Sequence, residues 1–210
     1  MKQTIVRLCT KITLITAVIG SGLFHIVFAQ SAADEHLAES LGVAQFTPSD
    51  ELIFPADTDR WVVLGTNIGG DYSDAEFDPK DPGTIGVVQM EPNAYAYLLE
   101  NGKYADGTML LLSFYEAQEK PEPELSGFVQ GELSAREIHV IDRMRYQDSR
   151  GFYLFAADGN GPSKMLPAGN ECVQCHAEHG DFDSTFTQFY PTIRDVVYQG
   201  EEQTISTVGE

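Results

Sequence analysis

Residues 108–117 read Thr-Met-Leu-Leu-Leu-Ser-Phe-Tyr-Glu-Ala, a long apolar run that ends in aromatic residues. Such a run, preceded by the turn signal Asp106-Gly107, predicts a β-strand. Successive side chains of a strand point to opposite faces of the sheet. One face of this strand therefore carries Leu110, Leu112 and Phe114, and the other carries Met109, Leu111 and Ser113.

The neighbouring segments predict a sheet around this strand. Thr84–Glu91 alternates as a strand does, and a helix begins at Pro92 and ends at Gly102. Phe128–Arg145 predicts one long strand or a strand pair, and Gly151–Ala157 a short aromatic strand. This order, with short connections, favours an α+β fold that is mainly an antiparallel β-sheet with flanking helices.

The remaining segments are less definite. Arg60–Asn67 predicts either a helical turn or a short strand, and Phe186–Gln199 either a C-terminal helix or an extended arm. Residues 69–83 and 118–124 are rich in Gly, Asp, Pro or Glu, and we expect them to form surface loops.

The charge of the chain excludes two classes of partner. The 210 residues contain 13 Lys and Arg against 32 Asp and Glu, for a formal net charge of -19. Nucleic-acid binding requires a basic surface that displaces counterions from phosphates, and docking on anionic lipid requires the same sign of charge. We therefore expect neither a nucleic-acid partner nor a membrane partner for the mature chain.

The first 29 residues resemble a secretory signal peptide. Lys2, Arg7 and Lys11 precede an apolar stretch from Ile12 to Ala29, which is the order of charged and apolar regions in such signals. We expect cleavage after Ala29 and export to the periplasm. An uncleaved membrane anchor remains the alternative, because a stretch of about 18 residues is near the lower limit for spanning a bilayer.

Cleavage would also remove Cys9 and leave two cysteines, Cys172 and Cys175. We divide the chain into a signal peptide (1–29), an N-terminal arm (30–50), one domain (51–200) and a flexible tail (201–210). An exported protein with one pair of cysteines normally forms a disulfide, but the residues around this pair indicate a different use.

The two cysteines belong to the sequence Cys172-Val173-Gln174-Cys175-His176. Cys-x-x-Cys-His is the attachment signature of c-type haem. The two thiols add to the two vinyl groups of the porphyrin, and the adjacent histidine gives its imidazole to the iron. The motif predicts one covalent haem c, held by Cys172, Cys175 and His176, on a segment near the C-terminus.

Two other uses of a Cys-x-x-Cys pair are a redox disulfide and half of a zinc site. A redox motif is expected in a βαβ unit, whereas this pair follows the Gly- and Pro-rich segment 159–169. Zinc needs about two further ligands at suitable spacing. His179 could supply one of them, but the chain has no second cysteine pair.

Four stretches, in order, resemble the cytochrome P-460 family, which includes the related c′-β cytochromes. They are Pro55…Arg60-Trp61-Val62…Gly65-Thr66, then Glu91-Pro92…Tyr95…Gly102…Asp106-Gly107-Thr108, then the haem motif, then Phe186-Thr187-Gln188-Phe189-Tyr190-Pro191. The resemblance implies a small periplasmic haem protein with an antiparallel sheet, usually a homodimer. It also implies a five-coordinate iron, bound by the motif histidine and open on its distal face.

The resemblance further implies which residues line the distal pocket. Family enzymes that oxidise hydroxylamine carry a lysine cross-linked to the porphyrin and a pocket arginine. In this chain those positions fall on Leu112 and Gly86, and the nearby Lys103 precedes the turn. If Leu112 and Gly86 face the haem, strand alternation adds Val88 and Phe114 to the pocket, so we expect an apolar distal wall without a general base or a cation.

Several other side chains are weaker candidates for the site. His139, Met90, Met109, Met144 or Met165 could ligate the iron from the distal side, although we expect a solvated or hydrogen-bonded histidine and methionines that fill the core. Glu116 is the main carboxylate candidate. We expect His36 and His179 to be solvated, and Glu137, Asp142 and Arg145 to form a structural polar cluster.

Together these features predict a periplasmic mono-haem cytochrome. An apolar pocket suits neutral diatomic gases such as NO and CO, or a role in electron transfer with a partner protein that the sequence does not identify. The alternative is a haem oxidoreductase that acts on hydroxylamine, NO or peroxide, so the sequence leaves open whether the protein is an enzyme.

We predict that the exported protein begins near residue 30. The charged n-region and the small residue Ala29 at the cleavage position favour removal of the signal. N-terminal sequencing of the protein from the periplasmic fraction measures the cleavage site directly. An intact Met1 on membrane-bound protein would establish the anchor instead.

Overall fold

The computed structural model describes residues 44–69, 78–120 and 126–208. The expected signal peptide and most of the N-terminal arm lie outside these ranges, as does His36. Residues 70–77 of the expected loop at 69–83 and residues 121–124 of the expected loop at 118–124 also fall outside them.

The described residues form one five-stranded antiparallel sheet in which every strand pairs with the next along the chain. The strands are β1 (Val62–Ile68), β2 (Thr84–Met90), β3 (Thr108–Glu119), β4 (Phe128–Ile141) and β5 (Arg150–Ala156). Three α-helices accompany them: α2 (Pro92–Asn101), α3 (Glu171–His179) and α4 (Pro191–Val208). The predicted α+β class with an antiparallel sheet is confirmed.

The C-terminal ends of β3 and β4 differ most from the predicted ones. β3 continues to Glu119, two residues into the segment expected to be a loop. β4 is a single strand and ends at Ile141 instead of Arg145. It ends there because the carboxylate of Asp142 accepts hydrogen bonds from the backbone N–H groups of Met144 and Arg145, at 3.0 and 2.9 Å, and closes a turn.

Helix α2 follows local sequence signals at both ends. The carboxylate of Glu91 accepts a hydrogen bond from the backbone N–H of Ala94 at 2.8 Å, and Pro92 occupies the first turn, where no N–H is needed. Gly102 ends the helix with φ of 65°, a left-handed conformation that glycine adopts without steric cost. The predicted bounds of this helix are confirmed.

Helix α4 follows the haem motif at the C-terminal end of the described chain. Phe186–Gln199 was predicted as a helix or an arm; the structure has a 3₁₀ turn at Thr187–Phe189 and then α4, which continues to Val208. Ile193 and Val197 are almost fully buried and belong to the same core cluster as Leu98 of α2. The buried face near its N-terminus anchors the helix.

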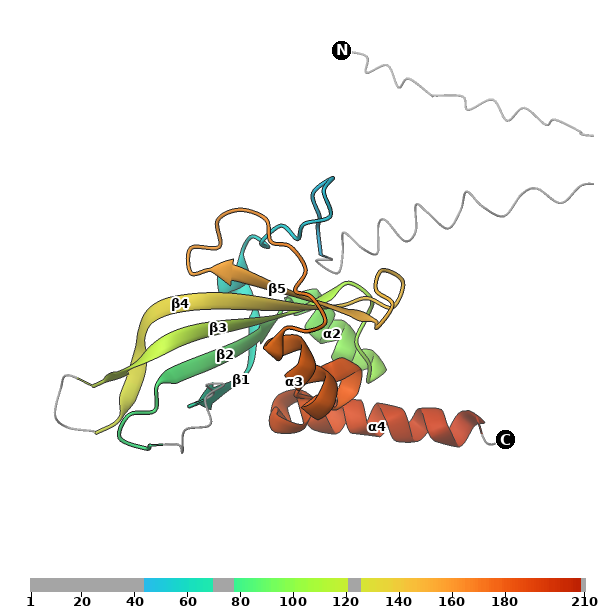
Figure 1. Cartoon of the computed structure of the whole chain (residues 1–210). Coiled ribbons are helices and arrows are strands. Elements are labelled where there is room, and N and C mark those ends of the chain that lie inside the picture. The colour runs from blue at the N-terminus through green and yellow to red at the C-terminus, as the bar shows by residue number, and fades with distance from the viewer. Residues whose placement is uncertain (1–43, 70–77, 121–125, 209–210) are drawn as a thin grey trace, which may run out of the picture.

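The two faces of the sheet carry separate cores, as the alternation on β3 predicts. Leu110 belongs to a cluster with Val88, Met90, Leu98 and Ile193, and Leu112 packs against it. Met109 and Leu111 belong to the other cluster, with Leu52, Trp61, Ile138 and Tyr153. Figure 1 shows α3 and α4 together on one side of the sheet. Within the described ranges no helix is long and apolar enough to cross a membrane.

We predict that Leu98→Ala lowers the free energy of unfolding by roughly 2–5 kcal/mol, because it leaves a cavity where α2 and α4 meet. Leu98 is 0% exposed, whereas its neighbour Leu99 is 44% exposed. Leu99→Ala is therefore a matched control and should change the stability by less than about 0.5 kcal/mol. Urea unfolding of both variants measures the difference, and equal effects would show that this helix contact is not part of the core.

Candidate functional site

Helix α3 carries all three residues of the Cys-x-x-Cys-His motif. Asn170 caps the helix, because its side-chain oxygen accepts a hydrogen bond from the backbone N–H of Cys172 at 3.0 Å. Residues three and four positions apart lie on the same side of a helix. Cys172, Cys175 and His176 therefore share one helix face. All three are half-buried, and neither cysteine forms a disulfide.

The imidazole of His176 is held in one orientation. Its Nδ1 lies 2.7 Å from the backbone carbonyl oxygen of Ser184. A carbonyl only accepts hydrogen bonds, so Nδ1 must carry the proton and Nε2 keeps a free lone pair. Burial lowers the pKa of His176 and favours the neutral ring. This is the tautomer and charge state of a metal-ligating histidine.

The return of the chain after α3 supplies that carbonyl. Asp183 and Ser184 adopt left-handed backbone conformations, with φ of 48° and 54°. Gly180 allows the close approach, since a Cβ there would lie 2.5 Å from the carbonyl oxygen of His176 and 2.6 Å from the carbonyl carbon of Ser184. A side chain at residue 180 would force these segments apart.

Three rings surround His176 and limit its motion. The ring centroids of Phe186, Phe152 and His139 lie 4.5, 4.8 and 5.4 Å from that of His176. His139 also stacks on Phe152, with centroids 4.3 Å apart. A distal iron ligand would lie across the porphyrin plane from His176. Because the rings of His139 and His176 are in contact, His139 would lie on the same side of that plane as His176 and not on the distal side.

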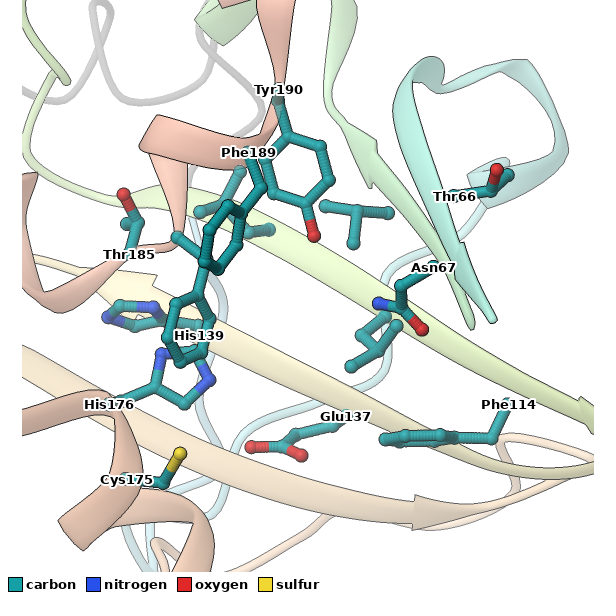
Figure 2. Close-up of a pocket in the computed structure, with 14 residues that line it drawn as sticks. Thr66, Asn67, Phe114, Glu137, His139, Cys175, His176, Thr185, Phe189 and Tyr190 are labelled. Atoms are coloured by element: carbon teal, nitrogen blue, oxygen red, sulfur yellow. The ribbon is translucent and has the colours of Figure 1, made fainter. Parts of the chain in front are cut away.

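A cavity of about 420 Å³ opens in front of the motif helix (Figure 2). Its volume is in the range of ligand pockets. Cys175 and His176 line it from α3, and Phe186, Phe189 and Tyr190 from the segment that follows. Three of the predicted pocket residues, Val88, Leu112 and Phe114, line its sheet side. Cys172 is not part of the lining, although it lies on the same helix.

Gly86 was predicted to line the cavity, but it does not. It is buried, and the side chain of Asn67 from β1 lies directly over it: a Cβ on Gly86 would be 2.2 Å from the Oδ1 atom of Asn67. Asn67 pairs with Gly86 across β1 and β2. The cavity wall at this point is therefore an amide group and not an empty position.

The cavity also has a polar part on the β4 side, where Glu137 and His139 line it. Their exposed fractions are 4% and 5%. In the described part of the chain, Glu137 Oε1 and both ring nitrogens of His139 have no hydrogen-bond partner. Burial raises the pKa of Glu137 to about 7, an effect that a hydrogen bond with Cys172 partly offsets. Burial and the nearby His176 hold the pKa of His139 well below its usual value.

Register explains why neither Glu137 nor His139 was expected to line the cavity. β4 pairs with β3 so that Glu137 lies beside Leu112, and His139 beside Leu110. Neighbouring residues across an antiparallel pair point to the same face. The alternation along β3 places Leu112 on the correct face of the sheet. It does not show which residues of β4 lie beside Leu112.

The other candidates lie away from the cavity. Glu116 and Lys103 are exposed and do not line it, and His179 is exposed as predicted. None of the four methionines lines it: Met90 and Met109 are buried in the cores, whereas Met144 and Met165 are 89% and 51% exposed.

The expected polar cluster of Glu137, Asp142 and Arg145 does not form. Glu137 lines the cavity, and Arg145 pairs with Asp50 and lies over the ring of Phe46, with its guanidinium carbon 3.4 Å from the ring centroid. Arg145 thus fixes the segment before β1 to the turn after β4.

The residues present fit a covalently attached haem c. Cys172, Cys175 and His176 share a face, the Nε2 atom of His176 is available, and an apolar cavity lies beside them. Phe189 also lines this cavity and is 68% exposed. Among the described residues no cluster of three or more His, Cys, Asp or Glu could hold a metal ion, and the sheet has no βαβ unit. Zinc and redox-disulfide chemistry therefore fit this motif less well.

We predict that the mass of the exported protein exceeds that of the mature peptide by one haem. His176→Ala should keep the attached haem but change its coordination, because the thioether bonds come from Cys172 and Cys175. His179→Ala, on an exposed position of the same helix, is the control and should leave the absorption spectrum unchanged. Intact mass spectrometry and optical spectra test both points, and a mass equal to that of the bare peptide would exclude covalent attachment.

Comparison with known proteins agrees with this assignment. The profile of the family described as Cytochrome P460 matches residues 55–187. No curated protein sequence matches the chain significantly. The profile match covers more than half of the chain and includes the five strands and the haem motif, whereas Phe189 and Tyr190 of the cavity lie beyond it. The chain therefore belongs to the cytochrome P460 family, whose members bind haem c.

Proposed function

We propose that this protein is a periplasmic mono-haem cytochrome that binds small neutral molecules, such as NO and CO, at an open coordination position of the iron, or transfers electrons through that haem. The observation that carries the proposal is the cavity in front of His176, which Val88, Leu112 and Phe114 wall on the sheet side. When bound, the haem supplies an iron with a position for one small ligand.

The residues around the cavity would have different roles in this function. His176 would bind the iron through Nε2, and the carbonyl of Ser184 would orient it by accepting from Nδ1. Phe186 and Phe152 would exclude water from the imidazole. Leu112 and Phe114 would limit the size of the bound molecule.

A second candidate function is oxidation or reduction of hydroxylamine, NO or peroxide. Glu137 favours it, because a buried carboxyl whose pKa is about 7 can exchange a proton near neutral pH. We place this function second because Leu112 and Gly86 stand where the resemblance implies the cross-linked lysine and the pocket arginine. Within the described ranges no lysine lines the cavity.

Location and assembly form part of the proposal. The charged n-region and apolar stretch before residue 30 support export to the periplasm. The resemblance to the c′-β cytochromes supports a homodimer. The excess of acidic residues makes a basic surface the natural complement on any redox partner.

We predict that Leu112→Ala accelerates CO binding to the ferrous protein by about threefold to tenfold, because it removes bulk from the approach to the iron. Hydroxylamine turnover should stay negligible in both the natural protein and the variant. Stopped-flow absorbance measures CO binding, and Leu99→Ala, exposed on α2, is the control. An unchanged rate would place Leu112 away from the iron. Steady hydroxylamine oxidation that is lost in Glu137→Gln would instead support the second candidate.

A further inference from the structure

One amide group stands out among the polar groups of the cavity, because two glycines and a tyrosine define its position. Asn67 lies on β1 at the pair Asn67↔Gly86, and Gly86 in turn pairs with Phe114 of β3. A Cβ on Gly86 would lie 2.2, 2.8 and 2.9 Å from the Oδ1, Cγ and Nδ2 atoms of Asn67. The whole amide therefore rests on the bare backbone of Gly86.

Tyr190 holds the other side of this amide. Its ring lies over Gly65, where a Cβ would be 2.5 Å from the ring carbon Cδ1. Burial raises the pKa of Tyr190, and a hydrogen bond donated by the side-chain amide of Asn67 partly offsets this rise. Gly65 and Gly86 thus leave room for the two partners of one polar pair.

The backbone around Tyr190 is fixed as well. Its N–H donates to the carbonyl of Thr187 at 3.0 Å, and its carbonyl accepts from the N–H of Ile193 at 3.0 Å, at the start of α4. The hydroxyl of Thr192 donates to the carbonyl of Leu64 on β1 at 2.8 Å. Helix α4 and β1 are therefore joined next to the pair.

The amide projects into the cavity from the side opposite the motif helix. In Figure 2, Asn67 and Phe114 enter the cavity from one side, and His176 and Cys175 enter it from the other. An iron held by the Nε2 atom of His176 would take a further ligand on the side of the cavity away from α3. Asn67 and Phe114 line that side.

We propose that Asn67, positioned by Tyr190 over Gly86, hydrogen-bonds to the small molecule bound at the haem iron. The proposal rests on the proposed function, because it assumes an open iron position in this cavity. The Nδ2 group of Asn67 carries two protons. One is directed to the hydroxyl of Tyr190, and the other is available to the ligand. A donor at that place favours ligands that carry partial or full negative charge.

Asn67 and Tyr190 therefore give the pocket a preference for ligands with negative charge, which its apolar residues cannot give. Leu112, Val88 and Phe114 select by size, whereas Asn67 selects by charge distribution. Asn67 acts on the ligand itself, and Tyr190 acts on the ligand only through Asn67, as a positioning residue.

Two ligands test the proposal on the haem-loaded protein. Infrared spectra of the ferrous CO complex report the field of nearby donors, and ferric fluoride binding reports a hydrogen bond to an anion. In Asn67→Leu we expect the CO stretching frequency to rise and fluoride affinity to fall by roughly tenfold to a hundredfold, as for loss of a charge-assisted hydrogen bond. Asn101→Leu, exposed at the end of α2, is the matched control and should change neither value.

Two further variants separate positioning from a general loss of structure. Gly86→Ala should displace the amide and reproduce the CO shift of Asn67→Leu, and Tyr190→Phe should shift the frequency less in the same direction. Haem content and the far-ultraviolet circular dichroism spectrum should stay at the level of the natural protein in Asn67→Leu. CO binding with an unchanged frequency in Asn67→Leu would overturn this proposal alone. Failure of the natural protein to bind CO would overturn the proposed function as well.

Discussion

The register of the three central strands determines what the cavity contains. Val88 of β2, Leu112 of β3 and Glu137 of β4 lie side by side in one row across the sheet. Because side chains alternate along a strand, a slip of one residue in any of these strands would turn its row to the opposite face. The same backbone hydrogen bonds thus position the apolar and the polar side chains of the cavity. A change of register would move both sets together.

Much of the fold could be predicted, because many of its elements follow from local sequence signals. Pro92 and Gly102 bound α2, the alternation on β3 separates the two cores, and the spacing of Cys172, Cys175 and His176 defines the attachment helix. Each of these features depends on residues close together in the chain. They remain visible in a single sequence because no distant partner is needed to define them.

The parts that could not be predicted depend on distant partners. Glu137 and His139 enter the cavity only through the pairing of β4 with β3, and Asn67 does so only because Gly86 lies opposite it on β2. In the sequence, Gly86 indicates only that the family's pocket arginine is absent. In the structure, its lack of a side chain leaves space for the side chain of Asn67 on β1. The carbonyl of Ser184 is a comparable case, since a backbone atom has no signature in the sequence.

The division of the core into two clusters makes the two faces of the sheet depend on different parts of the chain. The cluster of Leu52, Trp61, Met109, Leu111, Ile138, Val140, Tyr153 and Phe155 uses no residue after β5. The cluster on the other face requires Ile193 and Val197 from α4. One face of the sheet can therefore be buried without α3 or α4. The other face is covered only when α4 packs on it, so the side of the sheet that carries the cavity depends on the last segment of the chain.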